Sequence, residues 1–267
     1  MISQQALVLQ PWDLAAAAVL LLASAALSLR LALGVQRPLL LATARMVAQL
    51  LLVGLILDKV LALSSPWLTA LVVAVMLAAA TQAVQARQRR GLAGGWAVGM
   101  AGAVVGTITL GVTLLALHTA LRPEPWHDAR HLIPLTGIVL GAVMNAASLA
   151  LHNLFETVRR ERAAIEARLA LGHAPAQAFA PLARQAVLTG ILPTINQMTA
   201  AGIITLPGIM TGQILAGMDP LQAAKYQILL MLLLASGGLL AAVAAVRLAL
   251  WRLGDARSRL RLDRLKA

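Results

Sequence analysis

The basic residues of this chain gather in alternate gaps between long apolar runs. Of the 22 Lys and Arg residues, 18 fall in four gaps, namely Arg30 to Arg45, Arg87 to Arg90, Arg159 to Arg184 and Arg247 to Lys266. The intervening gaps hold only the other four, Lys59, Arg122, Arg130 and Lys225. Because basic residues stay on the cytoplasmic side of a bilayer, this alternation is typical of a polytopic membrane protein. It predicts an external N-terminus and a cytosolic C-terminus.

The composition supports the same class of protein and excludes several others. A chain that is 60% hydrophobic and 12% charged, with a mean hydropathy of +0.82, is too apolar to cover a soluble fold with polar groups. The net charge of +12 does not indicate a nucleic-acid partner, because aromatic residues make up only 3% of the chain. It favours contact with anionic lipid headgroups instead. The absence of cysteine excludes disulfides, thiolate metal sites and cysteine catalysis.

The length of the apolar runs predicts an all-α protein with about seven transmembrane helices. A spanning helix needs about 20 apolar residues, since each residue advances the helix by about 1.5 Å. Seven runs qualify: Leu14 to Leu33, Leu39 to Leu63, Trp67 to Gln85, Trp96 to Leu117, Leu132 to Leu151, Gln185 to Leu206 and Tyr226 to Leu250. No basic residue precedes the first run, so we expect a retained span rather than a cleaved signal peptide. We expect a single membrane domain over residues 1–267.

Glycines in the fourth span recur at helical spacing and leave one face of that helix without side chains. Such a groove permits close backbone contact between helices in lipid. It predicts either tight packing within the monomer or a subunit interface. The four glycines are Gly95, Gly99, Gly102 and Gly106.

The last large basic gap reads as a pair of cytosolic helices over residues 155–183 rather than as a loop. The first is predicted from Phe155 to Leu171, with Glu156–Arg160 and Arg162–Glu166 pairs at i,i+4 spacing. Gly172 suits the end of that helix, and Pro175 suits the first turn of a second, short helix. A thin apolar stripe for packing is formed by Val158, Ile165 and Leu169.

The sixth span carries the densest group of polar residues predicted within the membrane. Pro193 removes a backbone hydrogen bond at mid-span, and polar side chains follow within two turns. Amides at that depth are costly unless they face a neighbouring helix or a watery path. They predict interhelical hydrogen bonds or the lining of a translocation route. The polar residues are Thr194, Asn196, Gln197 and Thr199, and a non-helical turn is expected at Pro207, Gly208 and Gly212.

Two further polar positions are candidates for the same route. Arg45 and Gln49 lie one turn apart at the start of the second span, and Asn145 lies in the fifth. The alternative for Arg45 is a charge at the membrane boundary. In the outer loop, His127, Asp128 and His131 could share a helical face with metal-ligand chemistry, although solvated loops commonly hold such residues. Whether they bind a metal stays unknown at this stage.

Several catalytic and energy-coupling motifs are missing from the chain. It contains no GxxxxGK[ST] phosphate loop, no HExxH zinc motif and no GxSxG nucleophile elbow. It also lacks the intramembrane carboxylate on which proton-coupled carriers commonly depend. We therefore expect a non-enzymatic chain, and any transport would draw its energy from a partner.

Specific segments resemble a known family of transporters. The stretch IEARLALGHAPAQAF resembles the coupling loop of ABC-transporter permeases, with candidate contacts at Glu166, Ala167, Leu171, Gly172 and His173. The stretches ARMVAQLLLVGLIL, IPLTGIVLG, LPTIN and LPGIMTGQILAGMDPLQAAKYQ resemble the FetB-type iron-export permeases, which are similar to plant aluminium-tolerance permeases. The similarity runs from about Arg45 to Arg247. The chain departs from that pattern at Ala142, where the family usually has Asn, and at Thr199, where relatives carry a basic residue.

The resemblance implies a permease subunit of the bacterial inner membrane that exports iron with a separate cytosolic ATPase. ATP and Mg would be bound by that partner, with no cofactor in this chain, and the permease is expected to form a homodimer. Two alternatives remain. One is an ABC permease for another solute, such as another metal or a sugar nucleotide, and the other is a membrane scaffold that recruits a cytosolic protein through residues 155–183.

Overall fold

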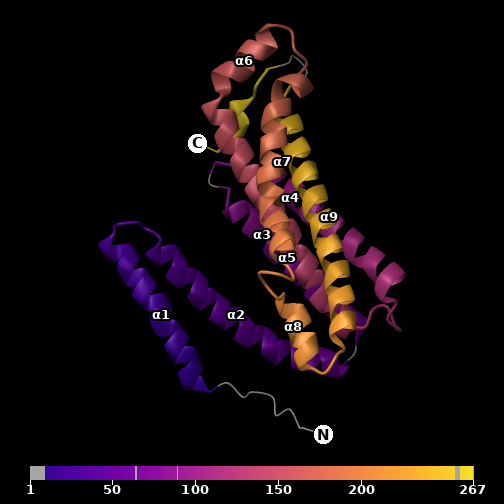
Figure 1. The fold of residues 1–267 in the computed structure, drawn as a ribbon. Coiled ribbons are helices and arrows are strands. Elements are labelled where there is room, and N and C mark those ends of the chain that lie inside the picture. The colour runs from indigo at the N-terminus through magenta and orange to yellow at the C-terminus, as the bar shows by residue number, and fades with distance from the viewer. Residues whose placement is uncertain (1–9, 64, 89, 256–258, 267) are drawn as a thin grey trace. The chain divides into compact units, whose positions relative to one another are not determined.

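The computed structural model describes residues 10–63, 65–88, 90–255 and 259–266. These residues fold into helices, with no strand among them. Within them, seven helices are long and apolar enough to cross a membrane, which confirms the all-α, seven-span prediction. The predicted external tail before Gln10 lies outside the described residues. The chain divides into two compact units, Met1–Leu63 and Ser64–Ala267, and Figure 1 follows it from indigo to yellow.

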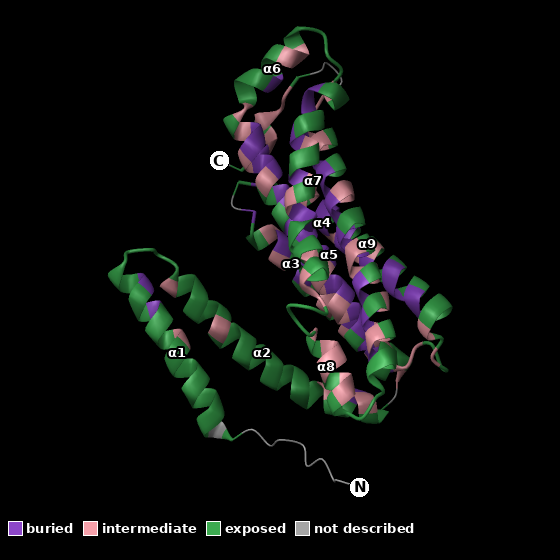
Figure 2. Ribbon diagram, in the orientation of Figure 1, coloured by how far each residue is buried: buried purple, intermediate pink, exposed green. Residues whose placement is uncertain are grey.

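The first unit is a pair of helices, α1 (Pro11–Arg30) and α2 (Gln36–Leu63). A short turn joins them, in which Ala32 and Gly34 adopt positive φ angles of 51° and 72°. Ser28 Oγ donates to Gln36 Oε1 at 3.1 Å across that turn. Most side chains of both helices are exposed (Figure 2), as expected for a pair whose apolar faces meet lipid or other helices.

The second unit is a bundle built around α5 (Ala129–Arg160). Helices α3 (Pro66–Ala86), α4 (Gly95–Ala116), α7 (Pro175–Ala200) and α9 (Pro220–Leu253) all pack against α5. Shorter segments complete it: a π-helical turn η1 (Leu117–Leu121), α6 (Arg162–Ala170), α8 (Gly208–Leu215) and a 3₁₀ turn η2 (Leu262–Arg264). The buried residues, purple in Figure 2, lie where these helices pack against one another.

Small residues allow α5, α7 and α9 to approach closely. A Cβ atom added to Gly190 of α7 would lie 2.7 Å from the Ala146 carbonyl oxygen and 2.9 Å from the Ala150 Cβ of α5. On α9, a Cβ on Gly238 would lie 3.2 Å from Ile191 of α7. Helix association in lipid depends on this kind of close contact.

The predicted glycine groove of α4 is not used in this way inside the second unit. Nothing lies within 4 Å of a Cβ placed on Gly95, Gly99 or Gly106, and Gly102 meets only the side chain of Thr81 at 3.6 Å. The interface role for this groove therefore stays a prediction. The closest helix contacts of the bundle depend on other glycines, which the spacing argument did not single out.

The polar end of the second unit differs from the prediction in two respects. Helix α5 continues to Arg160 and the chain turns at Glu161 before α6, so Phe155 to Leu171 is not one helix. Helix α7 begins at Pro175 and runs without a break to Ala200, so the predicted second helix is the first part of the sixth span and is not short. Its internal prolines, Pro181 and Pro193, do not end it. Pro207 is extended, but Gly208 begins a regular helix, α8, that also contains Gly212, where a non-helical turn was expected.

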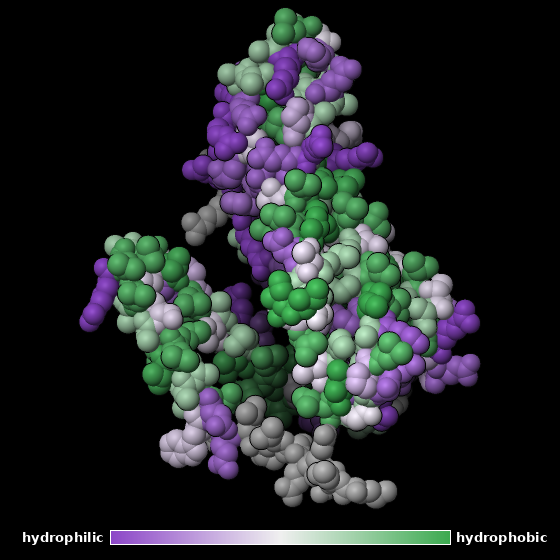
Figure 3. Space-filling view, in the orientation of Figure 1, coloured by the Kyte–Doolittle hydropathy of each residue, from purple (hydrophilic) through white to green (hydrophobic). Residues whose placement is uncertain are grey.

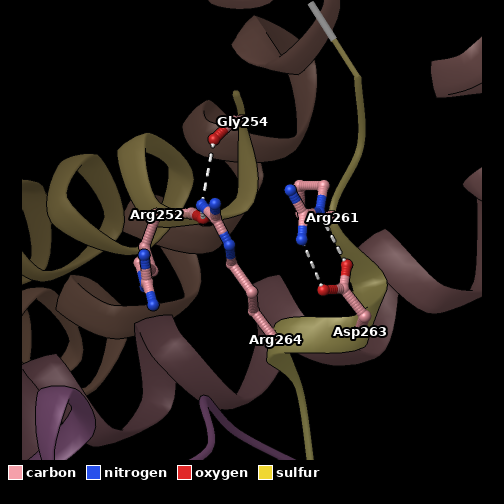
Figure 4. Close-up of polar contacts among 5 residues, drawn as sticks. All are labelled: Arg252, Gly254, Arg261, Asp263 and Arg264. Atoms are coloured by element: carbon pink, nitrogen blue, oxygen red, sulfur yellow. Dashed lines mark hydrogen bonds and ion pairs between the residues drawn. The ribbon is translucent and has the colours of Figure 1, made fainter. Parts of the chain in front are cut away.

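The C-terminal segment folds back onto this polar end. Leu265 is buried in the core and pairs with Leu92 in the turn between α3 and α4, where the Ala93 amide donates to the Arg264 carbonyl at 2.8 Å. Arg264 Nη1 donates to the carbonyl oxygens of Arg252 at 2.6 Å and of Gly254 at 3.3 Å. Figure 4 shows Arg264 bonded to Gly254 and Arg261 paired with Asp263. The bonds from the Arg261 guanidinium lower the pKa of the Asp263 carboxyl to about 2. The ends of α3, α4 and α9 are thereby joined.

The orientation of the chain gives a direct test. Reporter fusions after Leu63 and His127 are expected to score external, and fusions after Arg90 and Gly172 internal, because 18 of the 22 basic residues lie in the gaps that we place in the cytosol. Alkaline phosphatase and green fluorescent protein activities at the four points measure this. Reversed signals at all four points would contradict the predicted topology.

Candidate functional site

The polar residues predicted for a translocation route are divided between two places. Asn145 of α5 and Thr194 and Gln197 of α7 line one hollow of about 310 Å³. Its lining also includes Leu234 of α9 and several small residues, among them Gly137, Gly141 and Gly190. We call this space the α5–α7 hollow. The structure therefore brings three of the seven predicted route residues together.

The other four predicted route residues lie elsewhere. Asn196 and Thr199 are exposed on α7 and do not line the hollow, and Thr199 Oγ1 donates to the Ile195 carbonyl of its own helix at 2.9 Å. Arg45 and Gln49 belong to the first unit, where they line a shallow surface of about 410 Å³ on α2. Both are exposed there.

Depth along α5 places the hollow in the middle of the bundle. Gly137 lies eight residues and Asn145 sixteen residues after Ala129, at which α5 begins. At about 1.5 Å per residue these positions are about 12 Å and about 24 Å along the helix, within the roughly 30 Å of hydrocarbon that it must cross. The hollow thus lies within the part of α5 that is expected to cross the hydrocarbon.

One residue of this region was missed by sequence reasoning. Arg87, at the end of α3, donates from Nη1 to Oδ1 of Asn145 at 2.8 Å. Its neighbour Gln88 is buried and donates to the Ser148 carbonyl, one turn further along α5, at 2.8 Å. From the sequence, Arg87 is only one of the basic residues at the end of a span. Arg87 and Asn145 are separated by 58 positions in the sequence, so no local signal indicates their contact.

The predicted coupling residues lie together at the end of α6. Glu166 pairs with Arg162 at 2.7 Å, whereas the predicted Glu156–Arg160 pair is absent: Glu156 lies 3.5 Å from Arg90 and Arg160 lies 3.2 Å from Glu161. Figure 3 shows hydrophilic side chains gathered over α6 and the adjoining helix ends.

The tip beyond α6 is the most exposed part of this coupling region. Ala167 is exposed, and Leu171 is 79% exposed although it is apolar. Gly172 has a φ angle of +87°, which favours glycine, and His173 Nδ1 lies 3.1 Å from the Arg168 carbonyl. On the opposite side of α6, Ile165 is fully buried in the core. The tip is therefore anchored in the core through Ile165 while its outer face is exposed.

The residues of the predicted outer loop do not form a metal site in the described part of the chain. Asp128 caps α5 by accepting from the Arg130 amide at 3.0 Å and lies 3.6 Å from His131. His127 precedes the helix, so the three predicted residues do not share one helical face. No group of three or more His, Cys, Asp or Glu side chains among the described residues is placed to hold an ion.

Comparisons with known proteins identify the family. The profile described as Uncharacterised protein family (UPF0014) matches residues 11–253. The chain belongs to the UPF0014 family. Among the family's members, it is 41% identical over 204 residues to the UPF0014 membrane protein slr1647 of Synechocystis, covering 75% of this chain and 76% of that protein. No solved structure matches the chain significantly.

The chain is also similar to two other named proteins. It is 30% identical over 255 residues to the Escherichia coli protein named "Probable iron export permease protein FetB", covering 95% of this chain and 96% of that protein. It is 35% identical over 219 residues to the UPF0014 membrane protein STAR2 of rice, covering 81% of this chain and 74% of that protein. Family membership and the seven apolar helices identify a multi-pass membrane protein of the bacterial inner membrane.

Proposed function

We propose that this chain is the membrane-spanning permease subunit of an ABC transporter that exports iron with a separate cytosolic ATPase. The observation that carries the proposal is the match to the FetB protein over 95% of this chain. A match of that extent includes all seven apolar helices as well as the α6 tip. A match to only a fragment of the FetB protein would have supported a shared fold and nothing more.

The arrangement of polar groups supports the same function. The α5–α7 hollow provides amide and hydroxyl groups at mid-span, and the α6 tip projects an apolar side chain beyond the polar end of the bundle. A permease needs both features: a polar site for the solute within the membrane and a surface that a second protein can move. ATP and Mg belong to the ATPase in this proposal, because the chain has no phosphate-binding loop.

The partner must make different contacts in two states of the transporter. A surface transmits force only when the ATPase binds it differently before and after closure. The α6 tip suits this role because Ile165 anchors it in the core while Leu171 remains exposed. The chain itself would then alternate between two arrangements of α5 and α7 around the hollow.

Iron efflux in cells tests the proposed function. Cells that lack the chain are expected to retain iron after a loading pulse and chase and to become sensitive to peroxide. Gln197→Leu should fail to restore efflux, because it removes an amide from the hollow while keeping a similar volume. Gln185→Leu is the matched control on the same helix, since Gln185 is exposed and does not line the hollow.

The same measurement separates the alternatives. Equal cell-associated iron with and without the permease, while the ATPase is expressed, would contradict iron export and favour another solute. Loss of ATPase recruitment without any solute phenotype would favour a scaffold. Restoration by Gln197→Leu at the level of the parent would exclude the hollow from the route.

A further inference from the structure

We infer that the cargo enters the α5–α7 hollow as an oxyanion, so that iron crosses as a negatively charged carboxylate or phosphate complex rather than as a bare cation. This inference rests on the proposed function and narrows its substrate class. It begins from the guanidinium of Arg87, which is bonded to Asn145 at the edge of the hollow.

The charge of Arg87 is not neutralised within the described residues. Among the described residues its side chain makes a single hydrogen bond, to Asn145, and no ion pair with a carboxylate. A guanidinium has five N–H donors in a planar fork that matches carboxylate and phosphate oxygens. Four of those donors therefore remain for a ligand or for water. Arg87 is also exposed, so a solute can reach it.

The bond to Arg87 also decides what Asn145 offers. Because Oδ1 accepts from Arg87, the Nδ2 amino group of Asn145 is the part left to make a further bond. Gln197 and Thr194 add an amide and a hydroxyl, and neither makes a side-chain hydrogen bond to a part of the chain that the structure describes. The hollow thus offers N–H and O–H donors to the oxygen atoms of an anion, and of its three polar side chains only Asn145 has its acceptor oxygen already engaged.

The helices around the hollow provide no negative charge for a cation. Helices α3, α4, α7, α8 and α9 contain no Asp or Glu, and the single acid of α5 is Glu156, which lies near Arg90. An uncompensated divalent or trivalent ion in a membrane interior is strongly unfavourable. Arg87 would repel it further. A complex whose ligand carries excess negative charge avoids both the cost of placing a bare cation in the membrane and the repulsion by Arg87.

Transport into inside-out vesicles tests the inference. Vesicles holding the permease and its ATPase are supplied with ATP and with iron-55 as the ferric citrate complex, the ferric pyrophosphate complex or the aquated ferrous ion kept reduced by ascorbate. The citrate is labelled with carbon-14 and the pyrophosphate with phosphorus-32. We expect iron to enter together with one labelled ligand, and the ligand label shows whether the anion is a carboxylate or a phosphate.

Variants of Arg87 connect the result to the residue. Arg87→Gln should lower uptake of the complex at subsaturating concentration by about tenfold or more, because a charge-assisted contact is lost. Arg87→Lys keeps the charge and should retain more uptake than Arg87→Gln. The control is Arg90→Gln, the same change at a position that pairs with Glu156, and it should leave uptake unchanged. Surface expression measured in parallel separates loss of transport from loss of folding.

The possible outcomes are distinct. Uptake of iron supplied as the aquated ion, without entry of either labelled ligand, would overturn the inference and leave iron export standing. Unchanged uptake of the complex by Arg87→Gln would do the same. Absence of ATP-dependent iron uptake in every form would overturn the proposed function and this inference with it.

Discussion

Replacing Gly190 by leucine is expected to destabilise the second unit strongly. The added Cβ alone would lie 2.7 Å from the Ala146 carbonyl oxygen, 2.9 Å from Ala150 Cβ and 3.3 Å from Ala242 Cβ. The first of these atoms belongs to the backbone of α5 and cannot rotate away. Overpacking typically costs about 1–3 kcal/mol, and we expect the upper end of that range or more because three helices meet at this point. The measurement is the thermal unfolding midpoint of the purified protein in detergent.

Gly111→Leu is the matched control for this experiment. Gly111 also lies within a long apolar helix, α4, but nothing is within 4 Å of a Cβ placed there. Leucine has a higher helix propensity than glycine by about 0.8–1.0 kcal/mol at most, so the midpoint should stay unchanged or rise slightly. A midpoint for Gly190→Leu equal to that of the parent would show that α7 does not pack on α5 and α9 as the structure has it.

Charging the α6 tip is expected to abolish transport while leaving the membrane bundle intact. Leu171 is apolar and 79% exposed, so Leu171→Asp removes nothing from the core. In an ATPase interface, however, a buried carboxylate without a partner costs far more than the contact that it replaces. Gly172→Arg should have the same effect, through added bulk and through strain at a φ of +87°. Glu166→Lys reverses the charge on the adjoining face.

The readouts are copurification of the ATPase, iron efflux and the unfolding midpoint. We expect the first two to fall to background for all three variants. The midpoint should remain that of the parent for Leu171→Asp and Glu166→Lys and fall slightly for Gly172→Arg, because arginine is strained at a φ of +87°. Glu124→Lys provides the control, because it is the same charge reversal at an exposed position in the predicted external loop. Parental transport by any one variant would show that its residue does not contribute to coupling.

The predicted coupling segment shows which structural features can be predicted from neighbouring residues in the sequence. The Arg162–Glu166 pair, the end of a helix at Gly172 and the start of another at Pro175 were predicted correctly, because each depends on neighbours within one or two turns. The break at Glu161 carries no glycine or proline signal and was missed. This break between α5 and α6 places Ile165, which is fully buried, against the core. Packing with distant residues therefore decided the path of the chain there.

A proline inside a helix gave a weaker signal than one at its start. Pro193 was expected to remove a backbone hydrogen bond at mid-span, and α7 nevertheless continues through it for seven residues to Ala200. A proline removes one donor, and neighbouring helices, side chains or local adjustments can satisfy the freed carbonyl inside a membrane bundle. Close contact with α5 and α9 at Gly190, three residues earlier, holds this part of α7 in place.

The sequence by itself determined that this is an all-helical membrane protein with seven spans, because hydrocarbon thickness sets the length of each apolar run. It also identified the polar residues of the fifth and sixth spans. Only the tertiary structure decided which of them meet: Asn145, Thr194 and Gln197 share a hollow, whereas Asn196 and Thr199 point elsewhere. It alone placed Arg87 on Asn145 across 58 residues. Span length is a property of each helix and its solvent, but contacts between helices depend on their packing and rotation.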